Sequence, residues 1–243
     1  MNPTPSKRVA IMQPYFIPYL GYFQLIAAVD RFVIYDDVQY MVGGWINRNR
    51  IFDPSKEWRY LNVQLSGASP NKLIHEVEVD PNARWRRKTM GTLRSTYGKS
   101  PFSKEIMPVI EGIIQFPATG LAEFLRNSLR VLSEILGINT EIIPTSRKYD
   151  NTELGRMERI VDICNKEKRT HYVNAIGGRE LYDKDAFAAE GLELSFLEPN
   201  LSILKDMALA QVQGTDLGLS IIHLLFQYGP EACHHLVHRG KLV

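Results

Sequence analysis

Two carboxylates follow an apolar run near the start of the chain, where they could act as acids, bases or hydrogen-bond acceptors. The run Phe32 to Tyr35 leads directly into Asp36, Asp37 and Gln39. Ligands of open α/β sheets bind at the carboxyl ends of the strands, so these residues are candidates for catalysis and substrate binding. Because side chains alternate along a strand, only one aspartate should face the site. The sequence leaves open which one does so and whether the other has a capping role.

A second group of candidates lies in the elbow that follows the apolar run Val9 to Met12. Pro14 has no N–H for a sheet ladder, so the strand should stop at Gln13. We expect the polar and aromatic residues of the elbow to contact substrate, namely Gln13, Tyr15, Tyr19 and Tyr22. The layout of strand, loop and helix resembles that of nucleotidyltransferase-superfamily domains, where a helix N-terminus holds phosphate. Their loop histidines are missing here, which favours a nucleotide-shaped cleft over adenylyl transfer, and strand capping is the structural alternative.

The segment after a Gly-Gly pair is unusually polar. Trp45 and Ile46 precede four consecutive polar residues, Asn47, Arg48, Asn49 and Arg50. Strand alternation would place the two asparagines on one face and the two arginines on the other. Either pair suits a ligand with hydroxyls or phosphates, because amides donate and accept hydrogen bonds while arginine binds oxyanions with two donors. We therefore expect Trp45 and these four residues to bind substrate.

A third candidate site follows the strand-like run that begins at Thr170. Asn174, Gly177 and Gly178 lie just past this run, and paired glycines allow a ligand to approach backbone N–H groups. We expect a helix opening at Arg179 to aim its N-terminal dipole at the same place. His171 is a further candidate base, although a lone histidine in a strand is more often structural. No metal site is expected, because the carboxylates lack a third ligand and the C-terminal histidines lack an acidic partner.

The elements that position these residues can be read from hydrophobic periodicity. Short apolar runs predict strands, and apolar residues at intervals of three and four predict helices. The expected strands are 9–12, 32–35, 58–65, 74–79, 138–144, 170–176 and 192–197, and the expected helices are 22–29, 83–97, 108–114, 121–136 and 151–168. Alternation of strands and helices predicts an α/β fold with a Rossmann-like, mostly parallel sheet. We expect one α/β domain over residues 8–243, with a helical elaboration at about 83–136 and a flexible tail at 1–7.

Composition bounds the function classes. The chain has 243 residues, 44% of them hydrophobic, and a formal net charge of +2, so bulk charge does not predict a nucleic-acid partner. A basic cluster around Trp85, formed by Arg84, Arg86, Arg87 and Lys88, is either a solvated helix face or a dock for a phosphate-bearing partner such as a nucleotide sugar or an RNA acceptor stem. Neither a membrane span nor a signal peptide is expected, which predicts a cytoplasmic location.

Several long segments carry a family resemblance. MQPYFIPYLGYFQLI, FVIYDDVQY and GWINRNRI resemble the N-terminal signature of the WbqC-like protein family of bacterial polysaccharide gene clusters. YVNAIGGRELYDKDAFAAEGLELSFLEP resembles the middle block of that family, and LSILKDMALAQ with LGLSIIHLLFQYGPE resembles its C-terminal block. Two positions depart from the pattern. Met41, Val42 and Gly43 stand where basic residues are expected, and His223 stands where an acidic residue is expected.

The resemblance implies an enzyme of O-antigen or other surface polysaccharide biosynthesis. Such an enzyme would transfer an acyl or aminoacyl group, for example glycine, to the amino group of a nucleotide-linked amino sugar. An aspartate would orient or deprotonate the amine, and the asparagines and arginines would hold sugar hydroxyls and diphosphate. Acyl-CoA, a carrier protein, aminoacyl-tRNA and a free amino acid with ATP all fit as donors. Nucleotidyl-transfer or ATP-dependent ligase chemistry and a noncatalytic sugar-nucleotide-binding role are the alternatives.

Overall fold

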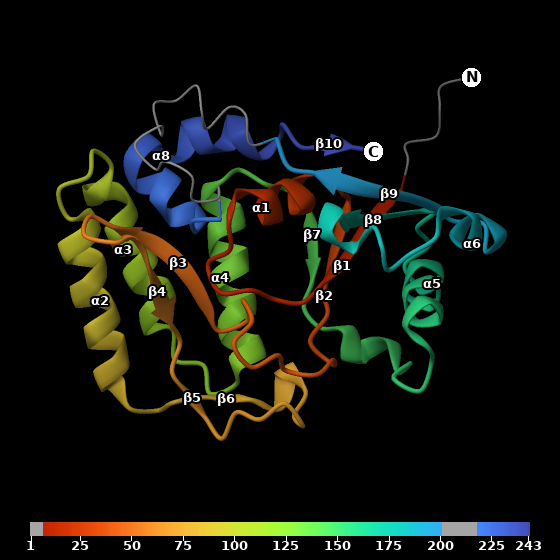
Figure 1. The fold of residues 1–243 in the computed structure, drawn as a ribbon, viewed down its shortest axis with the longest axis horizontal. Coiled ribbons are helices and arrows are strands. Elements are labelled where there is room, and N and C mark those ends of the chain that lie inside the picture. The colour runs from red at the N-terminus through yellow and green to blue at the C-terminus, as the bar shows by residue number, and fades with distance from the viewer. Residues whose placement is uncertain (1–6, 201–217) are drawn as a thin grey trace.

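The computed structural model of the protein describes residues 7–200 and 218–243. Within these residues a six-stranded sheet has the order β10-β9-β8-β1-β2-β7, and all neighbours are parallel except the pair β10 and β9 (Figure 1). Its strands are β1 (Arg8–Met12), β2 (Arg31–Ile34), β7 (Glu141–Ile143), β8 (His171–Ala175), β9 (Glu193–Glu198) and β10 (Lys241–Leu242). The prediction of an α/β fold with a mostly parallel sheet is confirmed, and the sheet is compatible with a Rossmann-like arrangement.

The first strand, helix and strand form as the apolar runs predicted. β1 and β2 are parallel neighbours, with Ala10 opposite Phe32 and Ile11 opposite Val33. Helix α1 (Leu20–Ala27) connects them and begins two residues earlier than expected, directly after the elbow. The elbow is therefore held between a buried strand and a helix with a largely buried surface.

Strand alternation divides the hydrophobic core between the two faces of the sheet. Ala10, Phe32 and Val173 pack into a core with α1 and with helix α8 (Ile221–Val237). Val9, Val33 and Tyr172 point the other way, into a core with α5 (Arg156–Lys166) and α6 (Lys184–Ala189). Helices thus cover both faces of the sheet, as a parallel sheet requires.

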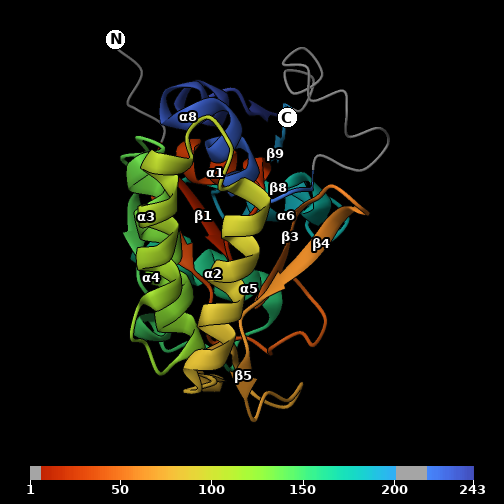
Figure 2. The same ribbon diagram turned by 90° about the vertical axis from the view of Figure 1, so that its left-hand side faces the viewer.

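The segment between β2 and β7 forms the elaboration beside the sheet. Helices α2 (Ala83–Tyr97), α3 (Ser103–Gln115) and α4 (Leu121–Ile135) lie side by side next to an antiparallel hairpin of β3 (Arg48–Asp53) and β4 (Glu57–Asn62) (Figure 2). A two-stranded ribbon of β5 (Leu65–Ser66) and β6 (Glu78–Val79) joins the hairpin to α2. The predicted helices at 83–97 and 121–136 match closely, and α3 extends beyond the predicted 108–114 at both ends.

Two local predictions are wrong. Residues 74–79 do not form one strand, because the Glu76 carboxylate accepts the backbone N–H of Leu73 at 2.8 Å and closes the 3₁₀ turn η1 (Ile74–Glu76) before β6. No α-helix opens at Arg179, since Ile176–Gly178 form the 3₁₀ turn η3 and α6 begins only at Lys184. Asp183 sets that start by accepting the first-turn N–H groups of α6.

Two further points concern the segments that the structure does not describe and the expected absence of a membrane span. Apart from Lys7, the predicted tail at 1–7 lies outside the described residues, and so does the segment LSILKDMALAQ. In the part of the chain that the structure describes, no helix is long and apolar enough to cross a membrane.

A buried carboxylate fastens β2 to the layer that contains α5. Glu167 is 5% exposed, accepts hydrogen bonds from Lys148 (2.8 Å) and Tyr149 (2.7 Å), and forms an ion pair with Arg31 of β2. Burial raises the pKa of Glu167, but the hydrogen bonds from Lys148, Tyr149 and Arg31 outweigh burial and hold this pKa below its usual value. Arg31 also pairs with Glu141, whose side chain is 54% exposed.

We therefore expect Glu167→Gln to lower the free energy of unfolding at neutral pH by about 3–5 kcal/mol, because it leaves a buried network without its anion. Glu141→Gln, which removes an exposed partner of the same arginine, should cost at most about 1 kcal/mol. The stabilisation by Glu167 is complete above the unfolded-state pKa of about 4.3 and is lost as the pH falls through the lower folded-state pKa. Urea unfolding at several pH values measures both effects, and equal losses in the two variants would contradict this role.

Candidate functional site

The strand order creates a crevice at the carboxyl ends of β1 and β8. The chain leaves β1 towards β2 on one side and later returns on the other side of β1 as β8. The two connecting helices, α1 and α5, pack against opposite faces of the sheet. At such a switch point the connections diverge, and ligands bind in the crevice between them.

A pocket of about 1110 Å³ opens at this crevice. Its walls come from the elbow after β1, the loop after β2, the start of α5 and the loop after β8. The predicted site residues that line it are Gln13, Tyr15, Tyr19, Tyr22, Asp37, Gln39, Trp45, Asn174, Gly177 and Gly178. This volume lies just above the range of about 300–1,000 Å³ that is typical of small-molecule sites, so the pocket has enough room for a ligand the size of a nucleotide sugar.

The structure separates the roles of the two aspartates. Asp37 lines the pocket, where its Oδ1 lies 2.7 Å from Nη2 of Arg159 and accepts a 2.5 Å hydrogen bond from Ser146 Oγ. Asp36 Oδ1 instead accepts from Thr145 Oγ1 at 2.7 Å and from the backbone N–H of Ser146 at 3.1 Å. Asp36 thus ties the end of β2 to the 3₁₀ turn η2 (Ser146–Tyr149), while Asp37 faces the site.

Asp37 keeps one hydrogen-bond acceptor free. Its Oδ2 is buried and has no hydrogen-bond partner among the described residues. Arg159 is fixed opposite by an Nε hydrogen bond of 3.2 Å to Asn151 Oδ1, and its guanidinium lies 4.8 Å from the ring centre of Tyr35. A held carboxylate with a free oxygen at a pocket wall is a suitable acceptor for a ligand N–H or O–H group.

Sequence reasoning missed Arg159, Ser146 and Tyr35. A signal for Arg159 was present, because this arginine lies one helical turn before Ile163 on the buried stripe of α5. A buried arginine in an apolar stripe needs an anionic partner. The sequence contains no comparable signal for Ser146, which meets both aspartates only through the fold.

Tyrosines form much of the remaining wall. Burial raises the pKa of Tyr15, Tyr19 and Tyr35, so their hydroxyls stay neutral at physiological pH. Tyr22 is fully committed to structure, since its hydroxyl donates to the Gln13 carbonyl at 2.8 Å and its ring lies 5.4 Å from that of Tyr15. These rings can stack on a sugar or base and donate single hydrogen bonds, but they are poor bases.

Both asparagines of the polar segment support the chain behind the pocket and do not line it. Asn49 Nδ2 donates to the carbonyls of Phe16 and Ile17, at 3.1 Å each. These hydrogen bonds pair the backbone carbonyls of the elbow, where Ile17 adopts a φ of +36°. Asn47 donates to the Val63 carbonyl at 3.0 Å and accepts from Tyr40 at 2.7 Å. The predicted alternation is seen within β3, where Asn49 is buried between the half-buried Arg48 and Arg50, whereas Asn47 precedes the strand. The structure places neither asparagine among the pocket residues.

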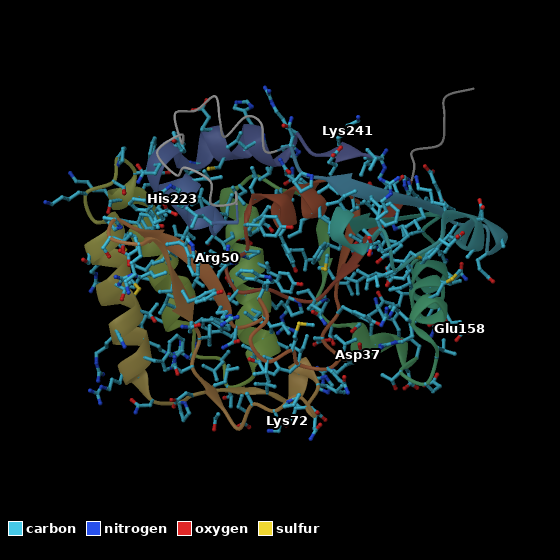
Figure 3. The ribbon with its side chains drawn as sticks, in the orientation of Figure 1. Asp37, Arg50, Lys72, Glu158, His223 and Lys241 are labelled. Carbon is cyan, nitrogen blue, oxygen red and sulfur yellow. The ribbon has the colours of Figure 1, made fainter. Side chains whose placement is uncertain are left out.

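Arg48 and Arg50 also lie outside the pocket, on the outer face of the β3–β4 hairpin. Figure 3 shows Arg50 on the hairpin and Asp37 at a separate position near the end of β2. Of the segment from 45 to 50, only Trp45 is shared with the pocket wall. His223, which stands at the second departure position, packs between Phe52 and Tyr97, and burial lowers its pKa to about 4, so it is neutral.

His171 lies at the opposite edge of the sheet from the pocket. It is the first residue of β8, in register with Arg8 and Glu193 at the starts of the adjacent strands. Its Nδ1 is 3.4 Å from the Glu193 carboxylate. The structure therefore does not bring His171 together with the aspartates. In the described ranges, 7–200 and 218–243, no group of three or more histidine, cysteine, aspartate or glutamate residues is arranged to hold a metal ion.

The two glycines after β8 have different surroundings. A Cβ on Gly178 would lie 2.4 Å from Nδ2 of Asn174, whose Oδ1 accepts the N–H of Ala175 at 2.8 Å, whereas a Cβ on Gly177 would meet no atom within 4 Å. The missing Cβ of Gly178 thus leaves room for the Asn174 amide in the pocket wall, and Gly177 leaves the backbone open to a ligand.

We expect Gly178→Ala to lower the free energy of unfolding by about 1–3 kcal/mol, because overpacking displaces the Asn174 amide. The neighbouring change Gly177→Ala serves as the control and should stay within about 0.5 kcal/mol of the wild type. Urea unfolding measures both. A Gly178→Ala variant as stable as Gly177→Ala would show that the Asn174 amide does not need the space left by Gly178.

Comparison with known proteins identifies relatives of this chain. The uncharacterized protein Rv1507c of Mycobacterium tuberculosis is 32% identical over 233 residues, which cover 95% of this chain and 97% of that protein. No solved structure gives a significant match. The model of the WbqC-like protein family matches residues 13–235 and so spans the elbow, the aspartates, the hairpin and the loop after β8. The chain therefore belongs to the WbqC-like protein family.

Proposed function

We propose that the protein is an enzyme of bacterial surface polysaccharide synthesis that transfers an acyl or aminoacyl group to the amino group of a nucleotide-linked amino sugar. The observation that carries this proposal is the carboxylate of Asp37, a residue of the wall of a large pocket, which is held through Oδ1 while its buried Oδ2 has no hydrogen-bond partner among the described residues. The family resemblance supplies the polysaccharide context, and the pocket supplies a chemical role for the acceptor amine.

The pocket has complementary surfaces for the parts of such an acceptor. The tyrosines Tyr15, Tyr19 and Tyr35 offer ring faces to a sugar or a base. Arg156 is exposed, lines the pocket and opens helix α5, so a cation and a helix N-terminus lie at the same rim. This pair favours a diphosphate. Asn174 and the open backbone at Gly177 offer hydrogen bonds to sugar hydroxyls or to a donor carbonyl.

The reaction requires one C–N bond to form and one bond to the donor's leaving group to break. The nitrogen lone pair of the amine attacks the acyl carbonyl carbon, and the nitrogen then loses a proton. Asp37 Oδ2 can accept a hydrogen bond from this amine and so orient it, and it can take the proton as the C–N bond forms. Arg159 and Ser146 keep the carboxylate in place during this transfer.

Replacing Asp37 with Asn should lower turnover of a nucleotide-linked amino sugar by about 10²- to 10⁴-fold, because the amide keeps the shape but cannot accept a proton. The binding constant of the amino sugar should change much less. Turnover by the folded protein, measured with several acyl and aminoacyl donors, tests this. Since the variant leaves Arg159 without its counter-charge, urea unfolding must accompany the assay and correct for any loss of folded protein.

Asp36→Asn is the matched control, because this neighbouring carboxylate contacts Thr145 and the Ser146 backbone and does not line the pocket. It should retain full turnover per folded molecule. Full activity of folded Asp37→Asn would remove Asp37 from the chemistry. Tight amino-sugar binding by the wild type without turnover of any donor would instead favour a noncatalytic sugar-nucleotide-binding protein.

A further inference from the structure

The outer face of the β3–β4 hairpin stacks arginines on aromatic rings. The guanidinium of Arg50 lies 4.5 Å from the ring centre of Trp58 and 5.0 Å from that of Trp45, and Arg48 lies 4.3 Å from the ring of Tyr60. The opposite face of the hairpin is buried through Asn49, Ile51 and Leu61 and belongs to the core. Packing explains the inner face but not the composition of the outer one.

Arg48 and Arg50 differ in how their charges are used. Arg48 donates to the carbonyls of Gly43 and Gly44 and so holds the loop before β3. The Arg50 guanidinium makes no hydrogen bond or ion pair with any residue that the structure describes, and its Nε is buried. The side chains that β3 and β4 place on this face are Arg48, Arg50, Phe52, Trp58, Tyr60 and Asn62, none of them a carboxylate. Phe52, at one end of the face, packs against His223 and the core, so the exposed part is formed by the other five. Arg50 is therefore a positioned cation that has no anionic partner among the described residues.

We infer that this face binds the single-stranded 3′ end of an RNA and that the donor of the reaction is therefore an aminoacyl-tRNA. The identity of the donor rests on the proposed function. Single-stranded RNA is recognised by stacking its bases on aromatic rings and guanidinium planes, while cations contact its phosphates. A face of tryptophan, tyrosine and an arginine without an anionic partner among the described residues offers such an RNA both stacking surfaces and positive charge.

Trp45 connects this face to the pocket. Its ring lies 6.3 Å from that of Tyr60 on the hairpin, and the same residue lines the pocket that contains Asp37. Trp45 is 37% exposed, so part of its ring is open to a base. An RNA end that stacks on the hairpin would thus place its last nucleotide at the pocket entrance.

Helix α2 offers positive charge on the side of the hairpin away from the pocket. It carries no acidic residue and lies beside the hairpin (Figures 1 and 2). The backbone N–H of Phe52 donates to the Tyr97 hydroxyl at 3.1 Å and fastens the hairpin to this helix. Arg84, Arg87 and Lys88 are exposed and form no ion pair with a described residue, whereas Arg94 pairs with Glu111. Such cations suit the phosphates of a duplex that continues from the single-stranded end.

The chemistry balances without a further reactant. The ester bond between the amino acid's carbonyl carbon and the ribose oxygen of the RNA breaks, and an amide bond to the sugar nitrogen forms. The proton that leaves the nitrogen passes through Asp37 to the ribose oxygen. No ATP, oxidant or reductant is consumed, because the ester is already activated.

The test is fluorescence anisotropy with a labelled RNA stem-loop that ends in a short 3′ overhang and with the same stem-loop made blunt. The overhang RNA should bind more tightly than the blunt RNA. Trp58→Ala should weaken overhang binding by roughly 5- to 150-fold, the range for loss of base stacking, and Trp58→Phe should restore most of it. Arg50→Gln should also weaken overhang binding. Arg239→Gln, which removes an exposed charge near the C-terminus, is the matched control and should have no effect.

Equal affinities for overhang and blunt RNA would overturn the inference, and so would overhang binding that survives both Trp58→Ala and Arg50→Gln in folded protein. Calorimetry with a nucleotide-linked amino sugar on the same preparations separates this inference from the proposed function. Amino-sugar turnover with acyl-CoA and no RNA binding would overturn only the inference. Hairpin-dependent RNA binding with no amino-sugar binding would leave the RNA surface standing and remove the proposed acceptor.

Discussion

The buried contact between Asp37 and Arg159 is the interaction on which the site depends. It joins the end of β2 to helix α5 across the crevice, and Ser146 adds the turn η2 to the same carboxylate. Taking two charges out of water is costly, and removing one of them from a buried pair typically destabilises a protein by about 3–5 kcal/mol. A purely apolar contact could join the end of β2 to α5 equally firmly. The ion pair is useful because it positions a carboxylate on a pocket wall with one oxygen still free. The tyrosine wall, the elbow and the loop after β8 line the same pocket as this carboxylate.

The hydrophobic pattern predicted most of the layout. Val9 to Met12 and Phe32 to Tyr35 were recognisable as buried parallel strands because apolar runs of that length fit a sheet covered on both faces. The rule that ligands bind at the carboxyl ends of strands predicted that Gln13, Asp37 and Asn174 lie at one edge of the sheet, and the pocket is lined by all three. The same rule, applied to His171, would have placed that residue at the far edge, because it begins its strand. The boundaries of η1 and α6 were missed because single side-chain caps at Glu76 and Asp183 decided them.

The roles of neighbouring polar residues could not be predicted locally. Asp36 and Asp37 have different roles because the fold places different partners beside them. These partners, Thr145, Ser146 and Arg159, come from segments distant in sequence, so the sequence around the aspartates does not indicate them. Asn49 looked like a ligand-binding amide, but the carbonyls of Phe16 and Ile17 needed a donor once the elbow had turned. Buried backbone carbonyls need hydrogen-bond donors, and both asparagines of the polar segment donate to such carbonyls. The two arginines lie on the hairpin surface. The asparagines of the same segment therefore support the chain behind the pocket, while its arginines stack on the aromatic rings of the hairpin.

We propose that Asp37 receives the acceptor amine in the crevice between β1 and β8. A crystal structure of the wild-type protein with a nucleoside-diphosphate-linked amino sugar tests this proposal. We expect electron density for the sugar in this pocket, with the amine nitrogen within hydrogen-bond distance of Asp37 Oδ2 and the diphosphate beside Arg156. Density at another site, or a sugar in this pocket with its amine directed away from Asp37, would show that Asp37 does not receive the amine.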